Sequence, residues 1–199
     1  MKDVSPNLHR FIAFLIDLFI KLGITLGWVM YISKSNTIEQ FMSLLLWIII
    51  FSIFSGFLIE AIITPLLISE FGGSLGKIIT GIEIVSTASK RLSFWKAVFR
   101  NYVGYVISGI FLWLGFIWIF IDKDHRGWHD LASDTYVRLV RKSGWIIGLL
   151  SLIVIMFVNI FMLSLTIQNF SSNKQIYTDL FEEVSTSIQQ SLKSTKTGT

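Results

Sequence analysis

Four long apolar stretches constrain the fold of this chain more than any other feature of its sequence. They cover residues 11–32, 41–68, 102–121 and 145–167. A helix needs roughly 20 apolar residues to cross a hydrocarbon core of about 30 Å, and helices satisfy their own backbone hydrogen bonds in lipid. The pattern predicts an all-α membrane protein, a small helical bundle with three to four membrane elements embedded in the lipid bilayer.

Composition supports this class and excludes others. Hydrophobic residues make up 53% of the 199 positions and charged residues 15%, whereas a soluble domain has about 25% charged residues. The chain contains no cysteine, which excludes a disulfide scaffold. The net charge of +4 is diluted by the apolar runs, so we expect no nucleic-acid partner.

The distribution of Lys and Arg predicts the orientation in the membrane. Residues 69–100 and 122–143 are rich in both, whereas residues 33–40 contain only Lys34. Cytoplasmic loops carry the excess of positive charge. We therefore expect the N-terminus and residues 69–100 to be cytoplasmic. The first apolar run is too long for a cleaved signal peptide, so we expect it to be retained.

The third apolar stretch leaves two alternatives. A single span over 102–121 would place residues 122–143 outside the cell and the tail, 168–199, inside. A re-entrant element would place 122–143 in the cytoplasm and the tail outside. We favour the re-entrant form because three glycines permit a bend: Gly104, Gly109 and Gly115.

Ionisable residues inside the apolar runs are the most informative residues of this sequence, because placing each one in a membrane helix costs about 2.5–3.5 kcal/mol on insertion scales. At about 100° per residue, Arg10, Asp17 and Lys21 share one stripe of the first helix. The rise per residue places Glu60 of the second helix at a depth similar to that of Asp17. We predict a buried cluster of these four residues facing the bundle interior. It serves either ion coupling or a purely structural ion-pair network.

The glycine-rich loop at 72–85 does not predict nucleotide binding. Phe71 occupies the position of the first Walker A glycine, and Ile78 follows Lys77 where Ser or Thr is needed. Residues 80–85 alternate in a way that predicts a short strand. We find no nucleophile elbow or ordered triad, and we therefore expect no enzymatic activity and no cofactor.

The densest polar segment lies at residues 122–137. His125 and His129 are four residues apart and close to Asp122. Two histidines at this spacing are a weak metal signal, and Gly127 disfavours a regular helix, so we assign no metal. We place Asp122, His125 and His129 at a candidate cytoplasmic mouth.

Three segments together resemble the RDD family of bacterial integral membrane proteins. They are Arg10–Asp17 (RFIAFLID), residues 72–85 (GGSLGKIITGIEIV) and residues 122–137 (DKDHRGWHDLASDTYV). The resemblance covers residues 8–140, which we take as the RDD-like membrane domain. It implies a multi-pass protein of the bacterial cell membrane.

The family is named for one Arg and two Asp, which correspond here to Arg10, Asp17 and Asp130. The chain departs from the family in having Ala-Ser-Asp-Thr at 132–135 where Ala-Gly-Thr is common, and in adding a further transmembrane helix at 145–167. The resemblance implies transport for some members and a role as partners or regulators of membrane proteins for others.

The C-terminal segment, residues 168–199, predicts an amphipathic helix followed by a disordered tail. An apolar stripe recurs at four-residue steps within 174–192, and residues 193–199 are polar and small. Acidic residues on this helix disfavour anionic lipid. We therefore expect it to contact a partner protein or a second copy of the chain.

Two functions follow from these features. The first is ion- or proton-linked transport by a homo-oligomer: Asp17 and Glu60 exchange protons or a small cation, Arg10 and Lys21 tune their pKa, and Asp130 lies at the mouth. The alternative is an accessory or regulatory subunit that binds another membrane protein through its C-terminal helix.

Overall fold

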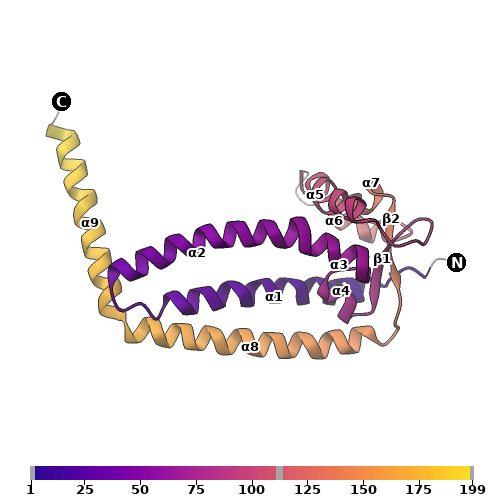
Figure 1. The fold of residues 1–199 in the computed structure, drawn as a ribbon, viewed down its shortest axis with the longest axis horizontal. Coiled ribbons are helices and arrows are strands. Elements are labelled where there is room, and N and C mark those ends of the chain that lie inside the picture. Colours follow the sequence, from indigo (N-terminus) through magenta and orange to yellow (C-terminus); the bar gives the residue numbers. More distant parts are fainter. Residues whose placement is uncertain (1–2, 111–113, 198–199) are drawn as a thin grey trace. The chain divides into compact units, whose positions relative to one another are not determined.

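The computed structural model describes residues 3–110 and 114–197. The chain is mostly helical, and its elements are α1 (Asn7–Ile32), α2 (Ile38–Leu58), the π-helical turn η1 (Ile59–Ile63), α3 (Thr64–Phe71), α4 (Leu75–Ile79), β1 (Ile82–Ser86), α5 (Phe94–Ile110), α6 (Leu114–Ile117), the 3₁₀ turn η2 (Trp118–Phe120), α7 (Trp128–Ala132), β2 (Thr135–Leu139), α8 (Gly144–Ser172) and α9 (Lys174–Thr197) (Figure 1). Three segments of the described chain are long and apolar enough to cross a membrane: α1, Ile38–Ile79 and α8. The predicted all-α membrane class is confirmed.

The chain divides into two compact units. The first unit contains residues 1–22 and 53–157, and the second contains residues 23–52 and 158–199. Each of α1, α2 and α8 therefore contributes one end to each unit.

The first unit contains a small antiparallel sheet. Strand β1 pairs with β2 from Ile82 opposite Leu139 to Ser86 opposite Thr135. The N-terminal segment extends the ladder, because Ser5 N–H donates to the Val137 carbonyl at 2.9 Å. The strand predicted at 80–85 is confirmed as β1, with bounds at Ile82–Ser86, whereas no sequence pattern indicated β2.

The core of the first unit lies where this sheet meets the helices. Its buried members are small or branched apolar side chains: Ala13, Ile68, Ile82, Ile84, Leu92, Ala97 and Val137. They come from α1, α3, α5, both strands and Leu92 just before α5. The part of the first unit around the β1–β2 sheet, which we call the polar layer, is thus packed onto the start of α1 (Figure 1).

The described parts of the third apolar stretch, in α5 and α6, pack against each other and do not form one spanning helix. Helix α6 lies against α5, and a Cβ added to Gly115 would be 2.5 Å from Ser108 Cα. The basic segments on either side, 69–100 and 122–143, meet in the β1–β2 sheet. The stretch therefore does not separate them, and the single-span alternative is wrong. Residues 111–113 of this stretch lie outside the described chain.

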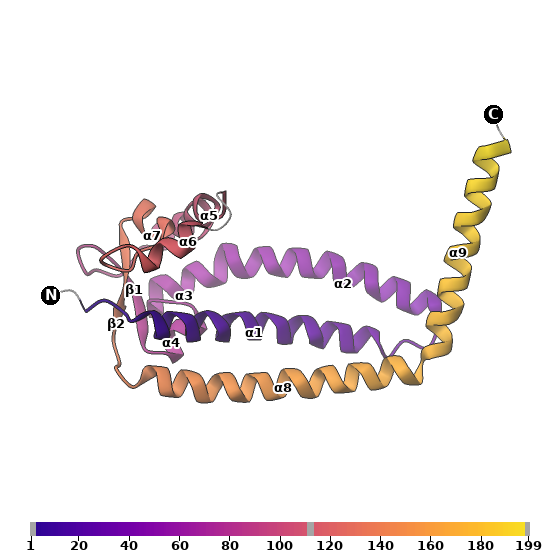
Figure 2. The same cartoon turned by 180° about the vertical axis from the view of Figure 1, so that it is seen from behind.

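The second unit joins the remaining helix ends through amide side chains. Asn169 Nδ2 donates to Ser33 Oγ and Asn173 Nδ2 donates to the Ser33 carbonyl, each at 3.1 Å. Helix α9 then turns away from the end of α8 (Figure 2). It continues to Thr197, so the prediction of disorder from residue 193 is wrong for residues 193–197.

Candidate functional site

The centre of the first unit is an ion pair between α5 and α7. Arg100 Nε and Nη2 donate to Asp130 Oδ1 at 3.0 and 2.7 Å, and both side chains are almost fully buried. Thr135 Oγ1 donates to the same oxygen at 3.2 Å, and Gly127 N–H donates to Oδ2 at 3.4 Å. The carboxylate is thus surrounded by donors, as a buried charge requires.

Arg10 fastens the start of α1 to this pair. Its Nη1 lies 3.9 Å from Asp130 Oδ2 and also donates to the His125 carbonyl. Its Nη2 donates to the Val137 carbonyl at 3.4 Å. The Arg10 Nε is buried and has no hydrogen-bond partner among the described residues. Arg10 therefore joins the helix to the segment 125–137 and retains one unused donor.

Asp17 holds the turn that precedes α4. Its carboxylate accepts hydrogen bonds from Ser74 Oγ at 2.5 Å and from Gly76 N–H at 2.8 Å. Glycine is required at 76 because a Cβ there would overlap the carbonyl oxygen of Ala13. An acceptor for free N–H groups at a helix start is a capping arrangement, so this contact positions the loop.

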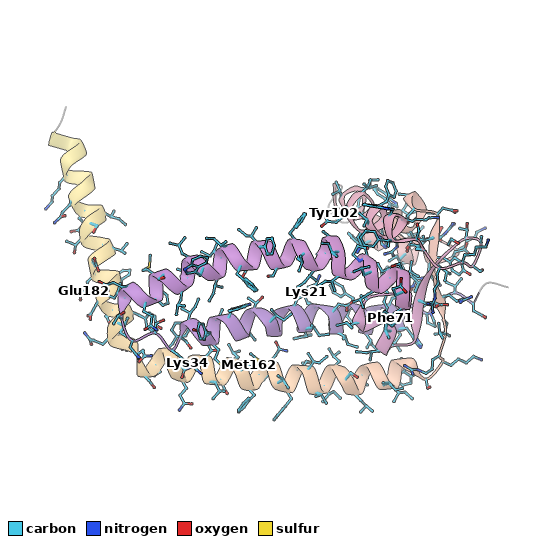
Figure 3. All side chains as sticks on the ribbon, viewed as in Figure 1. Lys21, Lys34, Phe71, Tyr102, Met162 and Glu182 are labelled. Carbon is cyan, nitrogen blue, oxygen red and sulfur yellow. The ribbon has the colours of Figure 1, made fainter. Side chains whose placement is uncertain are left out.

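Lys21 and Glu60, the other two residues of the predicted cluster, form an ion pair at the surface of the first unit. The ammonium of Lys21, labelled in Figure 3, binds Glu60 Oε1. The two side chains are 55% and 38% exposed. Glu60 belongs to the π-helical turn η1, a local geometry that is frequent at functional sites.

The predicted buried cluster of Arg10, Asp17, Lys21 and Glu60 is therefore wrong as one unit. Arg10 is held by the segment around Asp130, Asp17 holds the turn at 74–76, and the Lys21–Glu60 pair is half exposed. The prediction from the rise per residue assumed two straight helices lying side by side. It did not include the loops that fold back onto α1 and supply nearer partners.

His129 lies inside the Asp130 cluster. Its Nδ1 is 3.2 Å from Ser108 Oγ, and its Nε2 is 3.5 Å from Asp130 Oδ2. Burial lowers the pKa of His129 to about 3, so the ring is neutral near pH 7. Burial alone would raise the pKa of Asp130, but Arg100, His129 and Arg10 together outweigh it and hold that pKa well below its usual value.

Asp122 and His125 shape the turn before α7. Asp122 Oδ2 accepts from Asp124 N–H and Arg126 N–H, both at 3.0 Å. Burial opposes its ionisation, but the hydrogen bonds from Arg126 outweigh this and lower the pKa of Asp122. His125 has a left-handed φ of 51°. It therefore does not share a helical face with His129, contrary to the spacing argument.

A cavity of about 470 Å³ opens beside the cluster. Its charged lining comes from Arg10, Lys77, Arg100 and Asp130, and its apolar lining is mainly aromatic. Sequence reasoning missed Arg100, because a basic residue in segment 69–100 was interpreted only as an orientation signal. The described residues contain no group of three or more His, Cys, Asp or Glu side chains arranged to hold a metal ion.

The fold and site define a helical membrane protein whose first spanning helix is fastened by an Arg and an Asp to a small polar layer. The model of the RDD family matches residues 4–134, which is more than half of the chain. The chain therefore belongs to the RDD family.

One relative among curated proteins is "Uncharacterized protein YxaI" of Bacillus subtilis (strain 168). It is 31% identical over 107 residues, which cover 54% of this chain and 64% of that protein. The chain thus matches a little less than two thirds of the relative's length. No solved structure matches the chain.

Proposed function

We propose that the protein carries out ion- or proton-linked transport across the bacterial cell membrane as an oligomer. The observation that carries this proposal is the half-exposed Lys21–Glu60 pair on segments that can cross a membrane. Charged groups facing hydrocarbon are costly, and those within spans face a bundle interior or a water-filled path. A neighbouring protomer that covers the pair would provide that interior.

The proposal assigns the exchange step to Glu60 rather than to Asp17. Asp17 is occupied by Ser74 and Gly76, whereas Glu60 is 38% exposed and reachable from outside the protomer. Lys21 can pair with the Glu60 carboxylate and release it when a small cation competes for the same oxygen. Arg10 and Asp130 then serve the architecture of the polar layer.

The proposed orientation is a multi-pass one with a cytoplasmic N-terminus. The basic segments 69–100 and 122–143 share one sheet, so both lie on one side, and the positive-inside rule assigns that side to the cytoplasm. Three spanning segments then put α9 outside. A cysteine label on residue 190, tested in intact cells, checks this arrangement.

The test of transport is cation or proton flux in proteoliposomes under a pH gradient. Glu60→Gln keeps the shape of the side chain and removes its charge, and it should abolish most of the flux. Glu39→Gln is the matched control, because Glu39 is an exposed carboxylate in the first turn of α2. Equal flux through wild type and Glu60→Gln would refute the proposal.

A second function, that of an accessory subunit, is supported by α9. This helix exposes Phe181, Val184 and Ile188 at 73%, 50% and 55% on one stripe, which is a surface suited to helix packing. The measurement is site-specific cross-linking from position 184 in membranes. Cross-links to a different protein that disappear in a chain ending at Ser172 would favour this function over transport.

A further inference from the structure

The cavity in the first unit has an excess of positive charge. Arg10, Lys77 and Arg100 line it together with a single carboxylate, that of Asp130. Arg100 donates two hydrogen bonds to Oδ1 of Asp130, so this carboxylate is already paired with one of the three cations. The remaining charge makes the cavity attractive to an anion.

One buried donor and one buried acceptor in this cavity have no hydrogen-bond partner in the described part of the chain. The Nε of Arg10 and the Oδ1 of Asn7 are both buried, and neither has a hydrogen-bond partner in the described part of the chain. Both residues line the cavity. Unused buried polar atoms indicate that a further group completes the site, since leaving them unpaired costs free energy.

The rest of the lining is apolar and continues onto the outer face of α1. Phe11 and Phe14 lie on that helix and are each 59% exposed, and Phe120 is 72% exposed. A small inorganic anion would leave these rings uncovered. A ligand with a charged head and a hydrocarbon chain would use both parts of the lining.

The position along the spanning segments agrees with such a ligand. Arg10 lies in the first turns of α1, and Lys77 lies near the end of the segment Ile38–Ile79. Both are thus at ends of candidate spans, where lipid headgroups lie and where basic pockets bind them.

We infer that this cavity binds the phosphate of an anionic phospholipid, with Arg10 and Lys77 as its ligands and the phenylalanines against the acyl chain. The inference is independent of transport, because it uses none of the contacts of Lys21 or Glu60. It gives the polar layer a role in fixing the protein to one leaflet.

The experiment measures binding of a fluorescent phosphatidylglycerol to the full chain in neutral detergent, with phosphatidylcholine and inorganic phosphate as competitors. Wild type should prefer phosphatidylglycerol over both competitors. Lys77→Gln should weaken binding about fivefold, which corresponds to the loss of one cation near a membrane surface. Lys77 is partly exposed, so this variant should fold. Lys90→Gln, an exposed lysine outside the cavity, should leave binding unchanged.

Three outcomes would overturn the inference. They are equal competition by phosphatidylcholine, equal effects of Lys77→Gln and Lys90→Gln, and competition by inorganic phosphate as strong as that by phosphatidylglycerol. The last result would indicate a small-anion site. Phe14→Ala gives an additional check, because it should weaken lipid binding while leaving the protein's thermal unfolding almost unchanged.

Discussion

Two ion pairs of the same chemistry have opposite surroundings in this protein. Arg100 and Asp130 are buried and enclosed by donors from α7, β2 and α1, whereas Lys21 and Glu60 are half exposed at the surface of a spanning region. The first pair has its partners within the protomer. Lys21 and Glu60 pair with each other but stay half exposed. The difference separates a residue set that holds the fold from one that the proposed transport would use for exchange.

The largest effect is expected from Asp130→Asn. It leaves Arg100 and Arg10 buried without their counter-charge, and breaking a buried pair costs about 3–5 kcal/mol of unfolding free energy. Chemical unfolding in detergent measures this change in the unfolding free energy. Asp179→Asn on the exposed face of α9 is the control. A loss below about 1 kcal/mol for Asp130→Asn would show that the buried pair does not hold the fold.

Gly76→Ala should have the second-largest effect. We expect it to lower the unfolding free energy by about 3 kcal/mol, at the upper end of the cost of overpacking. The new Cβ would overlap the Ala13 carbonyl and displace the N–H that Asp17 accepts. Gly56→Ala is a matched control, since nothing lies within 4 Å of a Cβ there. If both variants unfold alike, the close contact between α1 and the 74–76 turn is not present in solution.

Acidification should lower the unfolding free energy of the protein. Burial lowers the pKa of His129 from 6.5 to about 3, so the unfolded chain binds one more proton than the folded chain between these pH values. The unfolding free energy then falls as pH drops below 6.5, by about 2 kcal/mol down to pH 4.5. The slope in this window should shrink in His129→Gln. An unchanged slope would mean that His129 is not buried in its neutral form.

The smallest stability effect is expected at the exposed pair. Lys21→Met should change the unfolding free energy in detergent by less than about 1 kcal/mol, because exposed pairs contribute little. The same variant should reduce flux in proteoliposomes. If Lys21→Met lowered the unfolding free energy as much as Asp130→Asn does, both ion pairs would hold the fold, and the difference between them would be refuted.

Local patterns in the sequence predicted the parts of the fold that depend on near neighbours. The spanning segments and the strand at 80–85 follow from apolar run length and alternation. The second strand, 135–139, could not be predicted in this way, because its pairing with β1 joins residues 49 to 57 positions apart. The packing of α6 against α5 agrees with the re-entrant form that the glycines favoured.

The candidate site was predicted less well, for the same reason. The resemblance to the RDD family led to Arg10, Asp17 and Asp130. In the structure Arg10 Nη1 lies 3.9 Å from Asp130 Oδ2. The spacing argument paired Arg10 and Asp17 with Glu60, since helix geometry alone cannot show which loop returns to a helix. Nothing in the sequence pattern singled out Arg100 or Ser108 as partners of the polar layer.

Cysteine accessibility at position 21 tests the contrast between the two pairs most directly. The chain has no native cysteine, so Lys21→Cys can be labelled alone in membranes with a water-soluble maleimide. Ile53→Cys is the reference for a lipid-facing position, since Ile53 is 71% exposed on α2. We predict rapid labelling at 21 and little at 53, because the proposed transport requires water to reach the exposed pair. Equally slow labelling at both positions would contradict this account.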